Sequence, residues 1–512
     1  MPENLASFKV FCQGGLNTSR DVLSQGENQP GSAVSLINYE PAVTGGYRKI
    51  NGFANNYGTV TGTGSVLGIC VADGINDGVL ACRKPSSGNN YLHKWNNSSS
   101  SWTAITTSGS PTMVGVTKVR FSRLNFGTPK VVLTDGINPA ATYDGSTYTQ
   151  ITHSDAPTDP KFSAVFQNHL FLAGDPAHPT KLFFSAPLAE TDFASGNGAG
   201  VINVGFPIVA IKAFRNELFI FGTTNIKKLS GTASANFVLQ TVTDDLGCLA
   251  TDSVIEIGGD LIFLSQDGLR PVAGTAKIGD VNLETISKNI QSIFTDIIFD
   301  IDLEGLNAVV IRQKTQFRYF FAGADTQGII GGFRQTPNGL QFEYSQMLGI
   351  TATCADSGFI GQNEIVIHGT SDGKVQQQES GNSFGGDPIF SIFQTPFFHM
   401  QDPEQRKIFY NVATYLRSEG DNNIVMSAVY DYEDVDTLNP TNFNLSTAGA
   451  AAFFNEATYN STAIFDGNPS PVQRTNISGS GKSASLKFVT NDTNASHSVQ
   501  GLVITFGVGD RL

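Results

Sequence analysis

The sequence predicts an all-β protein, with a β-propeller of six or seven blades and a β-rich platform domain that the two chain termini form. The first observation is composition: 54 Gly and 37 Phe accompany only 15% charged residues in 512 positions. Such a balance favours turns and aromatic strands over helical surface. The second observation is a recurring hairpin pattern, and the third is the regular spacing of those hairpins along the chain.

The recurring unit is a polar turn between two short runs of Val, Ile and Phe. Its clearest copies have turns at Asn168, Asn216 and Gly259, at intervals of roughly 45 residues. Weaker copies lie near Gly127, Thr315 and Asn363. A repeat of this length, with about four short strands in each copy, is typical of propeller blades.

The chain outside the repeats divides into two flanks. An early unit from Leu67 to Ile105 fits a first blade, and residues 66–385 are expected to form the propeller. Residues 1–65 are expected to be the N-terminal segment of the platform, which also contacts a partner, and 386–512 its C-terminal β-rich part. Because a propeller ring closes on itself, its two ends meet in space and both flanks can share one domain. The only amphipathic helix expected is Leu283–Phe294, which has isoleucines on one face.

Charge, cysteine content and hydropathy exclude several classes of protein. The net charge is −13, from 32 Lys and Arg against 45 Asp and Glu, which disfavours sequence-independent capture of nucleic-acid phosphates. The five scattered cysteines include no CxxC pair, so we expect neither a disulfide framework nor a zinc knuckle, and folding in a reducing cytoplasm. The N-terminus does not resemble a signal peptide, and no apolar stretch approaches the ~18 residues of a membrane span.

Two motifs resemble catalytic or nucleotide-binding sequences but lack the required context. Gly381–Gly385 matches GxSxG, which needs a strand, a strained turn and a helix, whereas Gly386 and Pro388 follow here. We expect a loop between the last blade and the C-terminal flank. Gly481–Ser483 resembles the end of a phosphate-binding loop, but the first Gly is missing and a strand follows.

Metal and acid–base sites are likewise not indicated. The acidic run Asp431–Asp436 places carboxylates at alternating positions but lacks the Gly of an EF-hand turn, so a solvated loop is expected. The seven histidines never occur at three- or four-residue spacing. We therefore expect no catalytic residue, no metal and no cofactor. A pair of carboxylates that meet at the propeller axis remains open, because distant blades converge there.

Several segments together resemble one protein family. Ile37–Pro41 and Gly45–Phe53 resemble the N-terminal signature of podovirus tail nozzle proteins, also called head-to-tail or packaged-DNA stabilization proteins. Asn216–Gly222 is similar to that family's propeller, and Thr395–His399 to its C-terminal platform. Asn51 departs from the family, which often has Asp before this Gly, although both residues suit the same turn.

The resemblance implies a structural virion protein and not an enzyme. It implies a homo-hexameric nozzle in the short tail, assembled in the host cytoplasm, that retains packaged DNA and forms the ejection channel. The expected partners are the adaptor (head-to-tail connector) ring above, tail fibre or tail tip proteins, and genomic double-stranded DNA that passes through the lumen without specific binding. We expect Asp, Glu, Asn, Ser and Gly to line that lumen, because bound Lys or Arg would hold the phosphates.

Seven residues are candidates for contact with the adaptor or a neighbouring subunit, because they are amphipathic or charged groups of the kind found in interfaces. They are Asn38, Tyr39, Glu40, Tyr47, Arg48, Arg406 and Lys407. Ordinary packing at the domain junction is an equal alternative for the first five, and surface solubility for the last two.

Two other functions remain open. One is a propeller glycan hydrolase of the phage tail, which would need acidic or Arg clusters at the axis. The other is a receptor-binding adhesin, which would expose aromatic side chains on its loops, whereas Trp is present only at Trp95 and Trp102.

Overall fold

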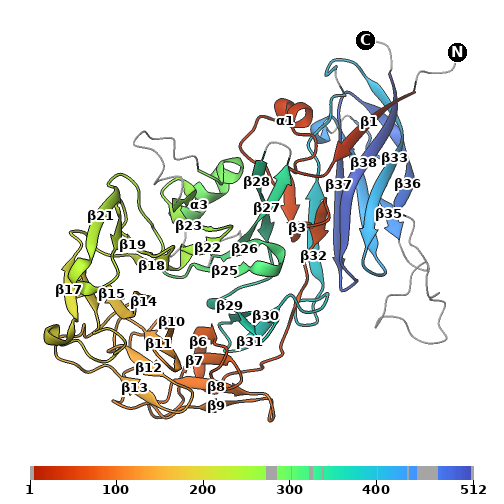
Figure 1. Ribbon diagram of the computed structural model, residues 1–512. Helices are drawn as coiled ribbons and strands as arrows, with labels where there is room; N and C mark the ends of the chain where they lie inside the picture. The colour runs from red at the N-terminus through yellow and green to blue at the C-terminus, as the bar shows by residue number, and fades with distance from the viewer. Residues whose placement is uncertain are drawn as a thin grey trace.

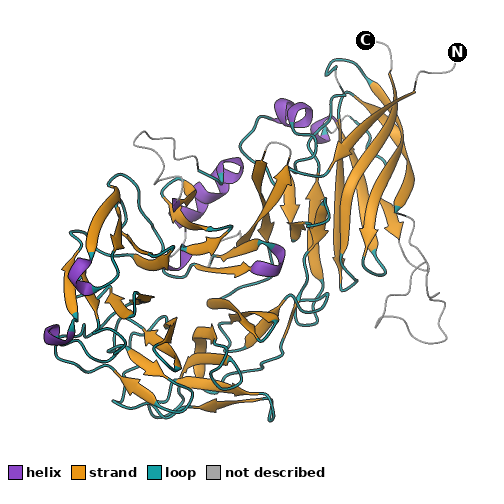
Figure 2. Cartoon of the chain, in the orientation of Figure 1, coloured by secondary structure: helices purple, strands orange, loops and turns teal. Residues whose placement is uncertain are grey.

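The computed structural model describes residues 5–272, 285–300, 303–321, 327–336, 339–400, 402–434, 437–446 and 471–508. These residues form two bodies, a ring of small sheets and an elongated sandwich beside it (Figure 1). Strands make up nearly all of the regular structure, with a few short helices at the periphery (Figure 2). The protein is therefore all-β, with a propeller and a second β domain, as the sequence predicts.

Seven sheets surround the propeller axis. The first four blades each contain four antiparallel strands in chain order. Their bounds are β6 (Thr63–Val71), β7 (Val79–Lys84), β8 (Leu92–Asn96) and β9 (Ser101–Ala104); β10 (Arg120–Asn125), β11 (Pro129–Thr134), β12 (Ala141–Tyr143) and β13 (Tyr148–Gln150); β14 (Phe162–Phe166), β15 (His169–Ala173), β16 (Lys181–Phe184) and β17 (Gly200–Asn203); β18 (Ala210–Phe214), β19 (Glu217–Phe221), β20 (Ile226–Ser230) and β21 (Val238–Thr243).

The last three blades depart from this regular plan. The fifth has three strands among the described residues, the sixth continues into the sandwich, and the seventh takes its fourth strand from the N-terminal flank. Their bounds are β22 (Ile255–Ile257), β23 (Asp260–Ser265) and β24 (Gly268–Pro271); β25 (Asn307–Ile311), β26 (Gln316–Phe320), β27 (Gly328–Thr336) and β28 (Gly339–Met347); β29 (Cys354–Ile360), β30 (Asn363–Gly369), β31 (Val375–Gln378) and β5 (Phe53–Ala54). The blade number is seven.

The turns identified in the sequence join the first and second strands of successive blades. At the turn around Asn168, φ is 47° for Gln167 and 63° for Asn168, and the pair Arg215 and Asn216 repeats this geometry at 48° and 60°. Two consecutive positive φ angles give the tight hairpin whose twist matches that of the flanking strands. Gly127, Thr315 and Asn363 mark the corresponding hairpins of the second, sixth and seventh blades.

Ring closure depends on the N-terminal flank. Strand β5 pairs antiparallel with β31, so a segment that precedes the first blade completes the last one. Phe53 of β5 stacks on Phe384 with ring centroids 5.2 Å apart. A Cβ at Gly52 would lie 1.8 Å from the Ser383 carbonyl oxygen, so this close approach requires glycine. The ring thus takes one strand from the 1–65 segment.

Both chain ends supply the sandwich. One sheet contains β2 (Ser35–Ile37), β32 (Ile389–Gln394), β37 (Ala484–Asp492), β34 (Asn423–Tyr430) and β35 (Phe443–Ser446). The other contains β1 (Leu5–Phe11), β3 (Tyr39–Pro41), β4 (Tyr47–Lys49), β38 (His497–Val508), β33 (Lys407–Ser418) and β36 (Val472–Gly481). Phe, Val, Ile and Leu side chains from the inner faces of both sheets form the core of the sandwich.

The propeller and the sandwich share one sheet. Strand β28 of the sixth blade pairs in parallel with β2, where Ile37 lies opposite Gln346, and nine strands thereby form one continuous sheet. Asn38 joins the two bodies at this point: its amide donates to the carbonyl oxygens of Leu348 (2.8 Å) and Phe390 (2.7 Å) and accepts from the Leu348 N–H (2.9 Å). Asn38 has φ 54°, a conformation that Asn tolerates better than most residues.

The helices are short. They are α1 (Val22–Asn28), α3 (Gln291–Asp300) and the 3₁₀ turns η1 (Ser195–Asn197), η2 (Ser234–Asn236), η3 (Thr251–Ser253), η4 (Lys288–Ile290), η5 (Arg312–Lys314) and η6 (Asp431–Glu433). The predicted helix Leu283–Phe294 is shifted: its first two residues lie outside the described residues, and helical structure runs through η4 and α3 to Asp300. Ile290 and Phe294 are fully buried, as the amphipathic pattern implies. None of the described helices has the length and hydrophobicity to cross a membrane.

We expect Asn38→Ala to lower the free energy of unfolding by about 3 kcal/mol, because it leaves buried backbone groups unpaired at the junction and places Ala at a positive φ. Urea denaturation followed by circular dichroism measures this change. Asn55→Ala is the matched control, because Asn55 is exposed on a nearby turn. Equal midpoints for the two variants would show that Asn38 does not hold the junction together.

Candidate functional site

The candidate contact residues on the short strands β3 and β4 lie largely inside the subunit. Tyr39 and Tyr47 are fully buried between the sandwich sheets. The Tyr39 hydroxyl lies 2.8 Å from Nε2 of His497, and the Tyr47 hydroxyl donates to the Gly31 carbonyl oxygen at 2.7 Å. Glu40, on the same short strand β3 as Tyr39, is 1% exposed. These side chains therefore organise the junction from within.

Glu40 belongs to an ionic network that crosses the junction. It accepts ion pairs from Arg48 (3.0 Å) on β4 and Lys314 (2.7 Å) on the propeller. Glu379, at the end of the seventh blade, binds both Lys314 and Arg318. Arg318 is completely buried in the sixth blade. Charges from two blades and the sandwich thus neutralise one another where solvent is largely excluded.

The network sets the protonation of Glu379. Burial alone would raise the pKa of this carboxyl, but the adjacent Arg318 and Lys314 outweigh it and lower the pKa to about 2.

Arg48 forms the outer side of the network. It donates to both carboxylate oxygens of Glu419, at 2.6 and 2.5 Å, and to Oδ1 of Asn51 at 2.9 Å. Asn51, at which the sequence departs from the nozzle-family pattern, therefore accepts a hydrogen bond from Arg48.

The two C-terminal candidates differ from each other. Lys407 is buried at the start of β33 and donates to the carbonyl oxygens of Lys482 (3.0 Å) and Asp402. Arg406 is exposed and donates to Oγ of Ser480 at 3.1 Å. Of the seven candidates, only Arg406 and part of Arg48 reach the surface of the subunit. The side chains of Asn38, Tyr39, Glu40, Tyr47 and Lys407 are buried in packing within the subunit, as the alternative of ordinary packing implies, and their contact with a partner stays a prediction.

The two segments that resemble catalytic and phosphate-binding motifs have structural roles. Gly381–Gly385 forms the loop between β31 and β32 without a helix, and Oγ of Ser383 accepts the Gly386 N–H at 3.1 Å. At Gly481–Ser483, the N–H groups of Lys482 and Ser483 donate to Oδ1 of Asp431, at 2.7 and 3.0 Å. This carboxylate occupies the position at which a phosphate-binding loop would hold phosphate.

The acidic run begins in the η6 turn, which Asp431–Glu433 form. Two of its six positions, 435 and 436, lie outside the described residues. Among the residues that the structure describes, no three His, Cys, Asp or Glu side chains are grouped as metal ligands.

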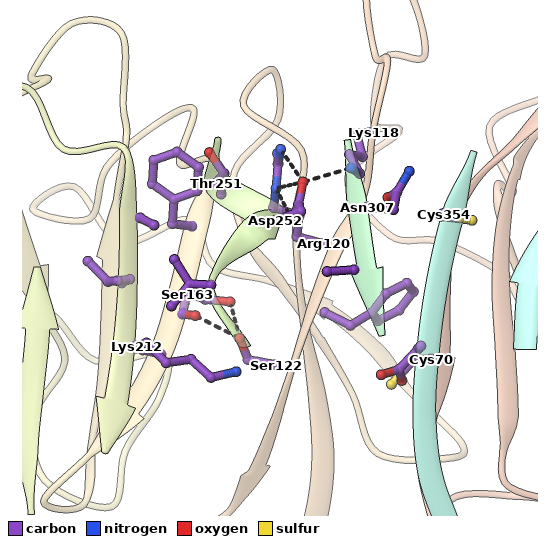
Figure 3. A pocket seen from close by; sticks show the side chains of 18 of the residues that line it. Cys70, Lys118, Arg120, Ser122, Ser163, Lys212, Thr251, Asp252, Asn307 and Cys354 are labelled. Atoms are coloured by element: carbon purple, nitrogen blue, oxygen red, sulfur yellow. Dashed lines mark hydrogen bonds and ion pairs between the residues drawn. The ribbon is translucent and has the colours of Figure 1, made fainter. Parts of the chain in front are cut away.

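A cavity of about 410 Å³ lies on the propeller axis and is a second candidate site (Figure 3). The innermost strand of every blade contributes to its wall. These strands are β6, β10, β14, β18, β22, β25 and β29. Six charged side chains line the cavity, Lys118, Arg120, Arg123, Lys212, Asp252 and Asp356. The sequence places them far apart, and the ring brings them together.

Both axial carboxylates are held by cations. Asp252 lies 2.7 Å from Nζ of Lys118 and accepts from Nε (3.0 Å) and Nη2 (2.9 Å) of Arg120. Burial would raise the pKa of Asp252, but these two cations lower it to about 2. Asp356 accepts from the Val71 N–H (2.8 Å) and from Arg123 (2.9 Å). Burial is the larger effect there and raises the pKa of Asp356.

No protein-family model matches the chain, and no curated protein matches it. Solved structures with similar folds include the WD40 β-propeller domain of Doa1. The two share 12% identity and a TM-score of 0.38, and the match covers 64% of this chain and 96% of that chain. An ancestral GH74 enzyme matches at 11% identity with a TM-score of 0.38, and the match covers 73% of this chain and 53% of the enzyme. The extracellular domain of a putative hybrid two component system from B. thetaiotaomicron matches at 12% identity with a TM-score of 0.39, and the match covers 66% of this chain and 41% of that chain. Such weak similarities do not indicate a shared function.

We expect Glu379→Gln to destabilise the protein by about 3 kcal/mol at pH 7, because the buried Arg318 then loses its closer carboxylate and keeps only the longer contact with Glu40, at 3.6 Å. The pH dependence has a defined sign. The folded-state pKa of Glu379 is below its unfolded value, so its stabilisation is present above about pH 4.5 and is lost as the pH falls toward 2.

Urea denaturation at several pH values tests both effects. The wild type should lose more stability than Glu379→Gln between pH 5 and pH 2.5. Glu404→Gln is the control, because that side chain is 80% exposed. Parallel stability curves for the wild type and Glu379→Gln would contradict the role of this carboxylate.

Proposed function

We propose that the chain is a structural subunit of the tail nozzle of a short-tailed bacteriophage, which retains packaged DNA below the adaptor and portal rings and forms the ejection channel. The observation that carries the proposal is the arrangement of the chain ends. Both termini fold into one β-sandwich that a continuous sheet joins to a propeller blade. The family resemblance of Ile37–Pro41 and Gly45–Phe53 implies a propeller and a terminal platform of this kind.

The junction suits a part that must resist force during DNA passage. Strand β5 closes the ring, the shared sheet continues from the sixth blade into the sandwich, and the ionic network around Glu40 links β3, β4 and two blades. A domain interface built only from small polar contacts would allow relative motion. Continuous backbone pairing makes such motion costly, because it would break buried hydrogen bonds.

The axial carboxylates argue against the hydrolase alternative. A glycosidase needs one carboxylic acid with a raised pKa and a second free carboxylate as base or nucleophile. Lys118 and Arg120 bind Asp252 and lower its pKa to about 2, while Asp356, whose pKa burial raises, is bound by Arg123. Neither carboxylate is free to act on a substrate, which supports a non-enzymatic role.

The positions of the two tryptophans argue against the adhesin alternative. Trp95 and Trp102 pack edge to face at 5.4 Å and are 6% and 9% exposed. Nε1 of Trp102 donates to the Tyr57 carbonyl oxygen at 2.6 Å. Their rings therefore belong to the core of the first blade, where they cannot stack on a sugar.

We expect six copies around the tail axis, with a mass of about 328 kDa for six chains of 54.6 kDa. Electron microscopy of purified tails, and of the protein mixed with the adaptor ring, should show a ring with a continuous central hole. Virions that lack this protein should lose their DNA or fail to attach later tail parts. Particles that keep their DNA and carry a complete tail without it would contradict the proposal.

We also expect the purified protein to bind duplex DNA only weakly, because its net charge of −13 opposes phosphate contact. Fluorescence anisotropy of a labelled duplex at 50 and 200 mM salt measures this. The expected dissociation constant is above about 10 μM at both salt concentrations. Tight binding that weakens steeply with salt would instead indicate a protein that clamps DNA.

A further inference from the structure

The axial cavity has a charge opposite to that of the whole protein. Four cationic side chains and two carboxylates line it, whereas the chain has a net charge of −13. The cations are Lys118, Arg120, Arg123 and Lys212, and the carboxylates are Asp252 and Asp356. The excess of positive charge is unexpected in an acidic protein, and a low-dielectric wall strengthens its effect on a bound anion.

Three of the four cations already have carboxylate partners. Lys118 and Arg120 share Asp252, and Arg123 pairs with Asp356. Lys212 differs, because its side chain has no hydrogen bond or ion pair in the described parts of the chain, although its backbone pairs with β19. The unpaired charge of the cavity is therefore that of Lys212.

Lys212 lies on β18 and extends toward Ser122 of β10 (Figure 3). Its side chain is reached by solvent, although the seven inner strands surround it. The hydroxyl oxygens of Ser122 and Ser163 lie 2.6 Å apart on the cavity wall, and the Ser122 hydroxyl donates to the Ser163 carbonyl oxygen at 2.8 Å. The ammonium group thus points into a space that polar groups line.

Charges of both signs act on Lys212. Glu256 and Asp356 attract the ammonium group, and Arg123 and Arg312 oppose them. The group lacks the stabilisation that a directly bound anion supplies, since no carboxylate of the protein forms an ion pair with it.

We propose that the axial cavity of the propeller binds a small oxyanion, through a phosphate or carboxylate group, with Lys212 as its principal cationic ligand. The hydroxyls of Ser122 and Ser163 are placed to contribute hydrogen bonds. The volume of about 410 Å³ accommodates inorganic phosphate or a small carboxylic acid. A DNA duplex is about 20 Å across and is excluded, so this site is separate from the DNA lumen of the proposed nozzle and does not depend on that function.

Isothermal titration calorimetry on the purified full-length chain tests the proposal, with inorganic phosphate and citrate as separate probes in chloride buffer of constant ionic strength. We expect saturable binding of at least one anion. Lys212→Met should weaken that binding at least tenfold, whereas Lys212→Arg should retain it within a few-fold. Lys9→Met is the matched control, because Lys9 is an exposed lysine on β1, outside the cavity.

The variants also separate loss of the site from loss of the fold. Because Lys212 forms no ion pair, Lys212→Met should melt at or above the wild-type temperature in anion-free buffer. Binding of phosphate alone assigns the site to a phosphoryl group, and binding of citrate alone assigns it to a carboxylate. Unchanged affinity in Lys212→Met, or no binding of either anion by the wild type up to 50 mM, would overturn the proposal.

Discussion

The pairing of β5 with β31 is the constraint on which the rest of the structure depends. A propeller is a curved row of sheets, and its first and last blades hold together only if the chain crosses the gap between them. Here the crossing strand precedes the first blade, so the N-terminal flank must arrive beside the seventh blade before the propeller begins. The C-terminal flank leaves from that same blade through the loop to β32. Closure therefore brings the two flanks together, and their strands pair as one sandwich.

The fusion of blade and sandwich has an electrostatic cost. Buried ions lose hydration, and their mutual attraction compensates only when the geometry is good. Glu40 pairs with three cations and Glu379 with two, which meets that requirement for the carboxylates. A purely apolar junction could be equally stable, but it would fix the relative orientation of the two bodies less narrowly. Directional ion pairs and the amide of Asn38 define that orientation.

Local features were predictable from sequence, whereas long-range pairings were not. The hairpin turns were found because Asn168 and Asn216 occupy a backbone conformation that few residue types adopt, and that preference is visible in sequence. The propeller fold and its separation from a β-rich flank followed from their spacing. The partner of Asp252 could not be found in this way, because Arg120 is 132 positions away and meets it only through the register of different blades. Tyr39 and Tyr47 have the amphipathic character of interface residues, but the same character suits a buried hydroxyl with a specific acceptor.

The distribution of charge follows from this geometry. Seven inner strands converge on a narrow axis, so any side chain that points inward is brought close to six other strands. Apolar side chains could have filled this space, as they fill the interfaces between the blades. Ion pairs form part of its wall instead, and they leave Lys212 without a carboxylate partner. Solvent reaches Lys212 inside the ring and no carboxylate pairs with it, so a small anion could bind this lysine without displacing an ion pair of the protein.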